Sequence, residues 1–129
     1  MRHKIFLLLV VGSFLACKVS TEEIPGVYVS KNQINNIDTI VVLKNGTYKK
    51  STYRKVDNSL IYINTGNWKY KEGRITFKDF FYDNDEVFSK DFQRFKDILI
   101  TSSFLIEERK GKVSIEFLEE KGEFRYQKL

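Results

Sequence analysis

Apolar and polar residues alternate in short stretches along this chain, and glycine-containing turns separate the stretches, a pattern typical of antiparallel hairpins. The clearest example is centred on Glu72-Gly73. With a two-residue turn there, Tyr70 lies opposite Ile75. Trp68 lies opposite Phe77 in the next row of the same face. Because turn and alternation agree, we predict this hairpin with Trp68 in the core.

Further stretches of this kind predict a chain built mainly of strands. Aromatic residues make up 15% of the chain and there is one proline, a composition that favours β structure. Gly66-Asn67 is expected to interrupt one strand. The expected strands cover residues 27–30, 38–44, 47–54, 60–64, 68–71, 74–77, 104–108, 113–118 and 123–128.

Asn45-Gly46 predicts a tight hairpin, because this pair tolerates the positive φ angles of a type I′ turn. A two-residue turn pairs Leu43 with Tyr48. The facing row then brings Val41 opposite Lys50, which joins an apolar residue to a charged one. The register at this hairpin therefore stays open to a shift by a β-bulge.

One segment has a helical pattern instead. Phe88, Phe92, Phe95 and Leu99 recur at helical spacing, and Ser89 is placed to cap the helix. We expect a short helix that packs on one end of the strands. A lid over an open barrel end is one functional alternative. The other is that the apolar stripe faces outward and forms a surface that a partner covers.

The first residues of the chain follow the order of a secretory signal. Basic residues 2–4 precede an apolar run over residues 5–11, and small residues lead into Phe14-Leu15-Ala16-Cys17. The apolar part is too short for a membrane-spanning helix, which needs about 20 apolar residues. We therefore predict export of the chain.

Phe14-Leu15-Ala16-Cys17 resembles the lipobox of bacterial lipoproteins, with Phe14 at a position where that family prefers Leu. The resemblance implies that a diacylglycerol is attached to the thiol of Cys17 and that the chain is cut before this residue. It also implies a protein held by lipid at a membrane of the bacterial cell envelope, which is the outer membrane where the cell has one. Cys17 is the only cysteine, so a disulfide within the chain is excluded.

The expected organisation is a signal peptide over residues 1–16, a lipidated cysteine with its tether over residues 17–25, and one β domain over residues 26–129. Lys18 to Glu23 is polar and has no apolar period. In extended form this stretch reaches about 20 Å, which would let the domain stand just off the membrane.

Charge excludes one class of partner. The chain has 22 Lys and Arg residues and 17 Asp and Glu residues, with the two signs interleaved. Because an exported protein also rarely meets nucleic acid, we expect no nucleic-acid partner. The densest basic stretch comprises Lys49, Lys50, Arg54 and Lys55. We interpret it as a solvated strand face, with weak attraction to anionic lipid or glycan as the alternative.

The residue types exclude most familiar catalytic chemistry. The only histidine is His3, which lies in the predicted signal peptide. A processed chain would lack histidine and a free thiol, which excludes Ser-His-Asp and Cys-His nucleophiles and metal sites built on these ligands. No glycine-rich phosphate loop is present. We expect no enzyme, no catalytic residues and no cofactor.

Asp79, Asp83, Asp85 and Glu86 form the densest acidic cluster. Carboxylates at alternate positions can converge on Ca²⁺, but this stretch lacks the glycine and the final glutamate of a calcium loop. We interpret the cluster as a solvated loop and expect no metal site. A glycosidase that uses paired carboxylates is the remaining catalytic alternative.

Four stretches of the chain are similar to small lipocalin-like lipoproteins of bacteria. The resemblance implies a mainly β fold, an antiparallel up-and-down meander that forms a barrel or half-barrel of about eight strands with one short helix. It implies no catalytic residues. The stretches are Gly26-Val27-Tyr28, residues 43–48, residues 66–77 and residues 124–129.

These observations predict a non-catalytic binding module for a small apolar or amphipathic ligand, whose binding residues the sequence leaves unassigned. The alternative is a lipoprotein of the immunity or inhibitor type that binds a toxin or hydrolase. A cavity inside the barrel would favour the ligand. A filled core with an exposed apolar patch would favour the protein partner.

Overall fold

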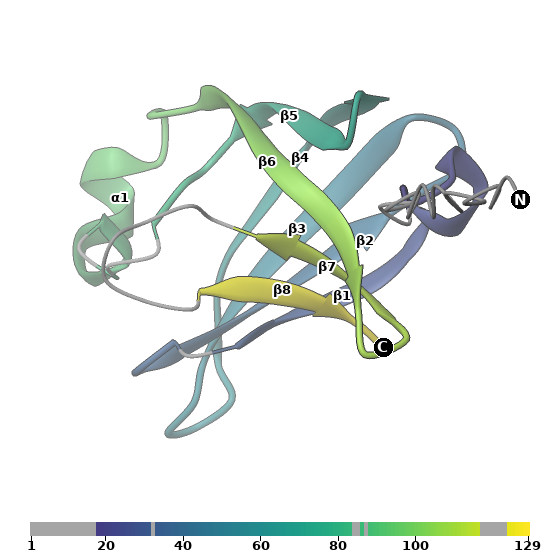
Figure 1. Ribbon diagram of the computed structural model, residues 1–129. Coiled ribbons are helices and arrows are strands. Elements are labelled where there is room, and N and C mark those ends of the chain that lie inside the picture. Colours follow the sequence, from purple (N-terminus) through teal and green to yellow (C-terminus); the bar gives the residue numbers. More distant parts are fainter. Residues whose placement is uncertain (1–17, 32, 84–85, 87, 117–123) are drawn as a thin grey trace, which may run out of the picture.

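Eight strands close into an antiparallel barrel (Figure 1). A computed structural model describes residues 18–31, 33–83, 86, 88–116 and 124–129. Each strand pairs with the next along the chain and β8 returns to β1, which confirms the predicted up-and-down barrel. The strands are β1 (Gly26–Lys31), β2 (Asn36–Val42), β3 (Thr47–Arg54), β4 (Leu60–Lys71), β5 (Arg74–Phe80), β6 (Ile100–Arg109), β7 (Lys112–Glu116) and β8 (Arg125–Lys128). The helical elements described are the 3-10 helices η1 (Thr21–Glu23) and η2 (Phe88–Asp91) and the α-helix α1 (Phe92–Phe95).

The hairpin of β4 and β5 has the predicted register. Tyr70 pairs with Ile75, and Trp68 pairs with Phe77. Ile75 and Phe77 are fully buried, whereas Trp68 is only partly buried against the core. Its indole Nε1 donates a hydrogen bond to the carbonyl of Leu43 at 2.8 Å. Trp68 therefore packs at the rim of the core, where its N–H finds a partner.

The hairpin of β2 and β3 departs from the predicted two-residue turn. Val42, not Leu43, pairs with Tyr48. The amide of Leu43 donates to the carbonyl of Thr47 at 2.9 Å, so the loop is one residue wider than predicted. A shift of one residue moves a whole row of side chains to the other face of a strand. The shift turns Val42 and Asp38 into the barrel, where both are buried.

β4 runs without interruption through Gly66, so the predicted break at Gly66-Asn67 is wrong. Close packing explains this glycine. A Cβ atom here would collide with the carbonyl oxygen of Lys78 and with the ring of Tyr48. The Tyr48 hydroxyl donates to that same carbonyl at 2.8 Å. The glycine therefore lets β3, β4 and β5 approach one another.

Side chains fill the interior of the barrel. Rings of Tyr48, Phe77 and Phe80 form its centre, with centroids 4.8 to 5.9 Å apart. Such a filled interior is typical of small barrels. Among the described residues, the largest fully buried side chains are Tyr28, Tyr48, Tyr126, Lys50, Phe77, Phe80, Phe81, Ile24, Ile40, Ile75, Ile115 and Val42.

The two ends of the barrel differ in their connections. We call one the turn end; it carries the short turns at residues 43–46, 72–73 and 110–111, the N-terminal segment 18–25 and Leu129. We call the other the helix end; it carries the connections 32–35, 55–59 and 81–99, which include α1. In Figure 1, α1 lies on the left, and the purple N-terminal segment 18–25 and the C-terminus lie toward the right.

The N-terminal segment packs on the turn end, so the expectation of an extended tether over Lys18 to Glu23 is corrected. Val19 and Ile24 are buried, and a 3-10 turn lies between them. The hydroxyl of Tyr70 donates to the carbonyl of Val19 at 2.7 Å. The hydroxyl of Tyr28 donates to the carbonyl of Ile24 at 2.5 Å. Two apolar side chains and two hydrogen bonds thus hold this polar stretch against the barrel.

A short helix forms at the predicted place, and η2 and α1 together cover residues 88–95. Phe92 stacks on Tyr62 with ring centroids 4.7 Å apart. It also meets Phe81 edge-on at 5.6 Å. These contacts place Phe92 over two buried rings, as a cap on the helix end.

Leu99, the last residue of the predicted apolar stripe, does not reach the core, and the side chain of Phe88 lies outside the described part of the structure. Asp91, rather than Ser89, precedes α1. Leu99 is 44% exposed, because the chain leaves the helix after Phe95. Ile98 and Ile100 beside it are each 46% exposed. Three consecutive apolar residues therefore face solvent where β6 begins.

Candidate functional site

Lys50 and Asp38 form an ion pair inside the barrel. Their side chains are 1% and 2% exposed, and Lys50 Nζ lies 3.5 Å from Asp38 Oδ2. Lys50 Nζ also donates to the carbonyl of Phe81 at 2.5 Å and to the hydroxyl of Tyr62 at 3.2 Å. A cation removed from water is tolerated when such partners surround it.

Hydrogen bonds from other strands satisfy Asp38. Thr52 Oγ1 donates to Asp38 Oδ1 at 2.6 Å, and the Tyr126 hydroxyl donates to Oδ2 at 2.9 Å. The backbone amide of Asp38 donates to Ser30 Oγ and Gln33 Oε1, each at 2.9 Å. We define the buried charge cluster as Lys50, Asp38 and the residues that form hydrogen bonds with them. Its hydrogen bonds connect β8 to β2, and β2 to β1 and β3.

Burial sets the protonation of this cluster. Burial lowers the pKa of Lys50, and the Asp38 carboxylate opposes that change. Burial raises the pKa of Tyr62 and that of Tyr126, and the Asp38 charge raises both further. The two phenols therefore remain protonated donors near neutral pH. Because the cluster is shielded from solvent, it is placed to order the interior rather than to meet a substrate.

The interpretation of Lys50 as part of a solvated strand face is wrong, although the other three basic residues of that stretch are exposed. Lys50 shares the inward face of β3 with Tyr48 and Thr52. The sequence does hold a signal for this, because these three residues occupy alternate positions. What the sequence lacks is any indication that Asp38, which pairs with Thr52 on the neighbouring strand, would approach Lys50 inside the barrel.

The acidic cluster of residues 79–86 is divided between surface and interior, which corrects its interpretation as a solvated loop. Asp79 is exposed, whereas Asp83 and Glu86 are buried. Asp85 lies outside the residues that the structure describes. In the described part of the chain, no group of three or more His, Cys, Asp or Glu residues is placed to hold a metal ion.

Glu86 fastens the β1–β2 connection. Its carboxylate accepts hydrogen bonds from the backbone amides of Asn35 and Asn36, at 2.8 to 3.0 Å. The side-chain amide of Asn35 donates to it as well, at 2.9 Å. Backbone and side-chain donors therefore already compensate the charge of this carboxylate.

An open groove of about 470 Å³ lies at the helix end, beside these residues. Ile34, Val56 and Ile61 supply apolar surface, and the first two are 82% and 85% exposed. Large apolar side chains at such exposure are costly to leave in water. The helix-end groove therefore offers apolar area that a ligand can cover.

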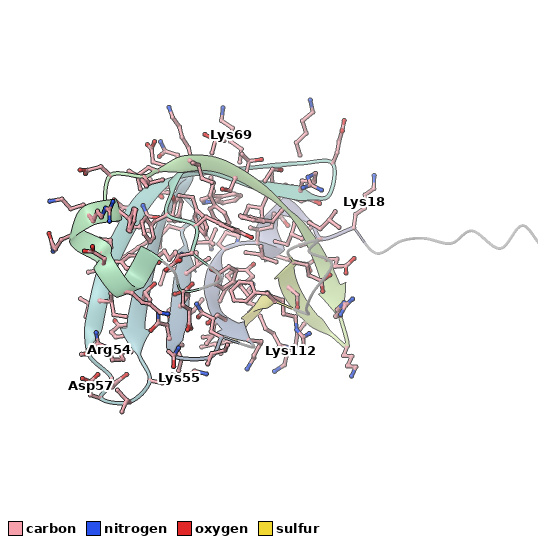
Figure 2. The ribbon with its side chains drawn as sticks, turned by 90° about the vertical axis from the view of Figure 1, so that its left-hand side faces the viewer. Lys18, Arg54, Lys55, Asp57, Lys69 and Lys112 are labelled. Carbon is pink, nitrogen blue, oxygen red and sulfur yellow. The ribbon has the colours of Figure 1, made fainter. Side chains whose placement is uncertain are left out.

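Cations surround the helix-end groove. Arg54, Lys55 and Lys90 line it, and Glu86 is the carboxylate among its lining residues. Arg54 forms an exposed pair with Asp57 at 3.7 Å, which water screens. The Lys55 ammonium donates a hydrogen bond to the backbone carbonyl of Gln33, which is neutral and leaves the positive charge of Lys55 uncompensated in that bond. Figure 2 shows Arg54 and Lys55 on the side of the domain opposite Lys18.

No family model, curated protein or solved structure matches the chain. Fold and site thus define the class by geometry alone: a closed up-and-down barrel of the lipocalin-like kind with a filled centre and an open groove at one end. Within the described ranges, no helix is long and apolar enough to cross a membrane. Cys17, the predicted site of lipid attachment, lies outside them.

Proposed function

We propose that the protein is a lipid-anchored lipoprotein of the bacterial cell envelope and a non-catalytic binding module, whose helix-end groove takes a small amphipathic anion. The observation that carries the ligand is the groove, where exposed apolar side chains and cations share about 470 Å³. Small-molecule sites have volumes of about 300–1,000 Å³.

The helix-end groove suits an amphipathic anion better than a purely apolar molecule. Ile34 and Val56 can cover an apolar chain. Arg54, Lys55 and Lys90 can meet a carboxylate, sulfate or phosphate group at its end. Since aromatic side chains occupy the centre of the barrel, this end offers more room for a ligand than that centre does.

Binding of dodecanoate, an amphipathic anion, tests this proposal by isothermal titration calorimetry. Val56→Asp and Lys90→Glu should each weaken binding at least tenfold, because the first places a charge on the apolar wall and the second reverses a cation. Lys69→Glu is the matched control, since Lys69 is exposed and lies apart from Arg54 and Lys55 in Figure 2. Equal affinity of all three variants, or no binding to the unaltered protein, would contradict a ligand in this groove.

The anchor is proposed from the lipobox-like motif at Cys17. Mass spectrometry of the purified protein should show a diacylglyceryl group on Cys17, and Cys17→Ala should lack it and be released from membranes by mild washing. An unmodified thiol on Cys17 in the exported protein would refute the anchor.

A protein partner of the immunity or inhibitor type is the second candidate. Two observations favour it: the filled centre of the barrel, and the exposed apolar run Ile98, Leu99 and Ile100. The filled centre also means that the small ligand proposed above is assigned to the helix-end groove and not to the barrel interior. Leu99→Asp would then abolish binding of a toxin or hydrolase and leave dodecanoate binding intact. A surviving complex with such a partner would exclude this run as the interface.

A further inference from the structure

The position of the first docked residue limits how far the barrel can stand from a lipid on Cys17. Val19 is 2% exposed, and its carbonyl accepts a hydrogen bond from Tyr70 at 2.7 Å. Cys17 precedes Val19 by two residues, a span of at most about 7 Å. A lipid on Cys17 therefore brings the turn end, and no other part of the barrel, against the membrane.

Charge distinguishes this end from the other. The three short turns, counted with the strand residues that flank them, carry six basic residues and one acidic residue. Counted the same way, the described residues of the three connections 32–35, 55–59 and 81–99 at the helix end carry six basic and five acidic residues. Because the barrel alternates its connections between two ends, this difference in sequence becomes a difference between two surfaces.

The lysines of the turn end are free to meet a charged surface. Lys44, Lys71, Lys110 and Lys112 are all exposed, and each turn contributes at least one of them. Lys18 adds a further exposed cation next to the anchor. The acidic residues in the turns and the N-terminal segment of this end are Glu22, Glu23 and Glu72. Glu107 and Glu116 pair with Arg109, so that arginine is already neutralised.

Apolar and aromatic groups accompany these lysines. Leu43 is 44% exposed in the first turn, and Leu129 is 80% exposed at the end of the chain. Trp68 and Lys44 line a shallow hollow of about 290 Å³ beside the N-terminal segment. Tryptophan and lysine side by side suit a membrane interface, where the ring takes the headgroup level and the ammonium meets phosphate.

We infer that the turn end is a lipid-contact surface that rests on anionic headgroups. This orientation directs the helix-end groove away from the membrane. The inference rests on the proposed anchor, because the lipid on Cys17 is what would bring the turn end near the membrane. The exposed lysines are the reason that we expect the headgroups to be anionic. A lysine near such a surface changes binding about fivefold, and the effect fades with salt over a Debye length of about 10 Å.

The sole tryptophan, Trp68, makes the contact measurable. The lipid-anchored protein is placed in vesicles of phosphatidylcholine, with or without phosphatidylglycerol, that carry bromine near the headgroup. Bromine should quench Trp68 more strongly when phosphatidylglycerol is present, and added salt should reverse the gain. Trp68→Phe gives the background signal.

Two triple variants separate the ends of the barrel. Lys44→Gln/Lys71→Gln/Lys110→Gln should lose the gain from phosphatidylglycerol. Lys31→Gln/Lys78→Gln/Lys96→Gln changes three exposed lysines toward the helix end and should keep it. Equal quenching in both kinds of vesicle, or the same loss in both triple variants, overturns the inference.

Failure of the anchor gives a different result. If Cys17 proves to be unmodified, the same chain is floated with each kind of vesicle without the lipid. Binding to phosphatidylglycerol vesicles that the turn-end triple variant loses would still support the lipid-contact surface. If the unmodified chain does not bind these vesicles, both the lipid-contact surface and the anchor are refuted.

Discussion

Lys50→Met tests the role of the buried charge cluster. Methionine keeps most of the length of the side chain, so the substitution removes the charge and the donors with little loss of volume. Asp38 would then keep a buried negative charge without its cation, and the carbonyl of Phe81 would lose the donor at 2.5 Å. Removal of one partner from a buried ion pair costs about 3–5 kcal/mol. A domain of this size has a total stability of about 5–15 kcal/mol, so the variant should be close to unfolding.

The double variant Asp38→Asn/Lys50→Met supplies the control. Asparagine removes the unpaired charge. Its amide oxygen can still accept the hydrogen bond from Thr52, and the amide nitrogen in place of Oδ2 can donate to the Tyr126 hydroxyl. The loss in the double variant should therefore be smaller than the sum of the two single losses, by about 2 kcal/mol or more. Urea unfolding followed by Trp68 fluorescence measures each free energy of unfolding. If Lys50→Met loses less than about 1 kcal/mol, or if the two changes are additive, the cluster does not act as a unit.

Three further outcomes follow from the packing and the titrating groups. Phe92→Ser should lower the free energy of unfolding by about 2 kcal/mol, because Tyr62 and Phe81 lose the ring that covers them; an unchanged urea midpoint would show that α1 does not cap the barrel. Gly66→Ala should cost about 3 kcal/mol, since its Cβ meets backbone at Lys78; a loss below about 0.5 kcal/mol in thermal unfolding would mean that the strands are not in close contact there. Above about pH 10 stability should fall, by up to about 1.4 kcal/mol per pH unit for each of Tyr62 and Tyr126, because their pKa values are raised in the folded protein and unfolded tyrosines ionise near 10. The stability that these tyrosines contribute is fully present below their pKa in the unfolded chain, and it is lost as the pH rises toward their pKa in the folded protein. A free energy of unfolding that stays constant between about pH 8 and 11 would show that these phenols are not buried.

Local signals predicted the fold where turn and core agree. At Glu72-Gly73 the two-residue turn and the apolar face specify the same register, and the observed pairs follow it. At Asn45-Gly46 they conflict, because the tight turn would place Leu43 and Val41, instead of Val42 and Ile40, on the inward face beside Tyr48. The register shifts by one, which places Val42 in the core. Burial of a whole row of side chains outweighs the preference of one turn.

The buried charge cluster depends on contacts that no local pattern contains. Lys50 and Asp38 lie on adjacent strands, but Tyr126 comes from the last strand and Phe81 from the connection after β5. A lysine in an alternating strand is more often a surface residue, and the sequence offers no sign that several distant partners will surround it. The helix-end groove could not be predicted for the same reason, because Val56, Ile34 and Lys90 come from three connections that are far apart in the sequence.

The groove and the buried charge cluster meet in the connection between β5 and β6. Lys90 lines the groove, and Phe92, two residues further on, stacks on Tyr62. The Tyr62 hydroxyl in turn accepts a hydrogen bond from Lys50 at 3.2 Å. Long connections are the parts of a barrel that vary most freely, yet this one is tied to the interior by a ring. We therefore expect a ligand held by Lys90 to stabilise the segment that places Phe92 over Tyr62, and with it the cover of the buried ion pair.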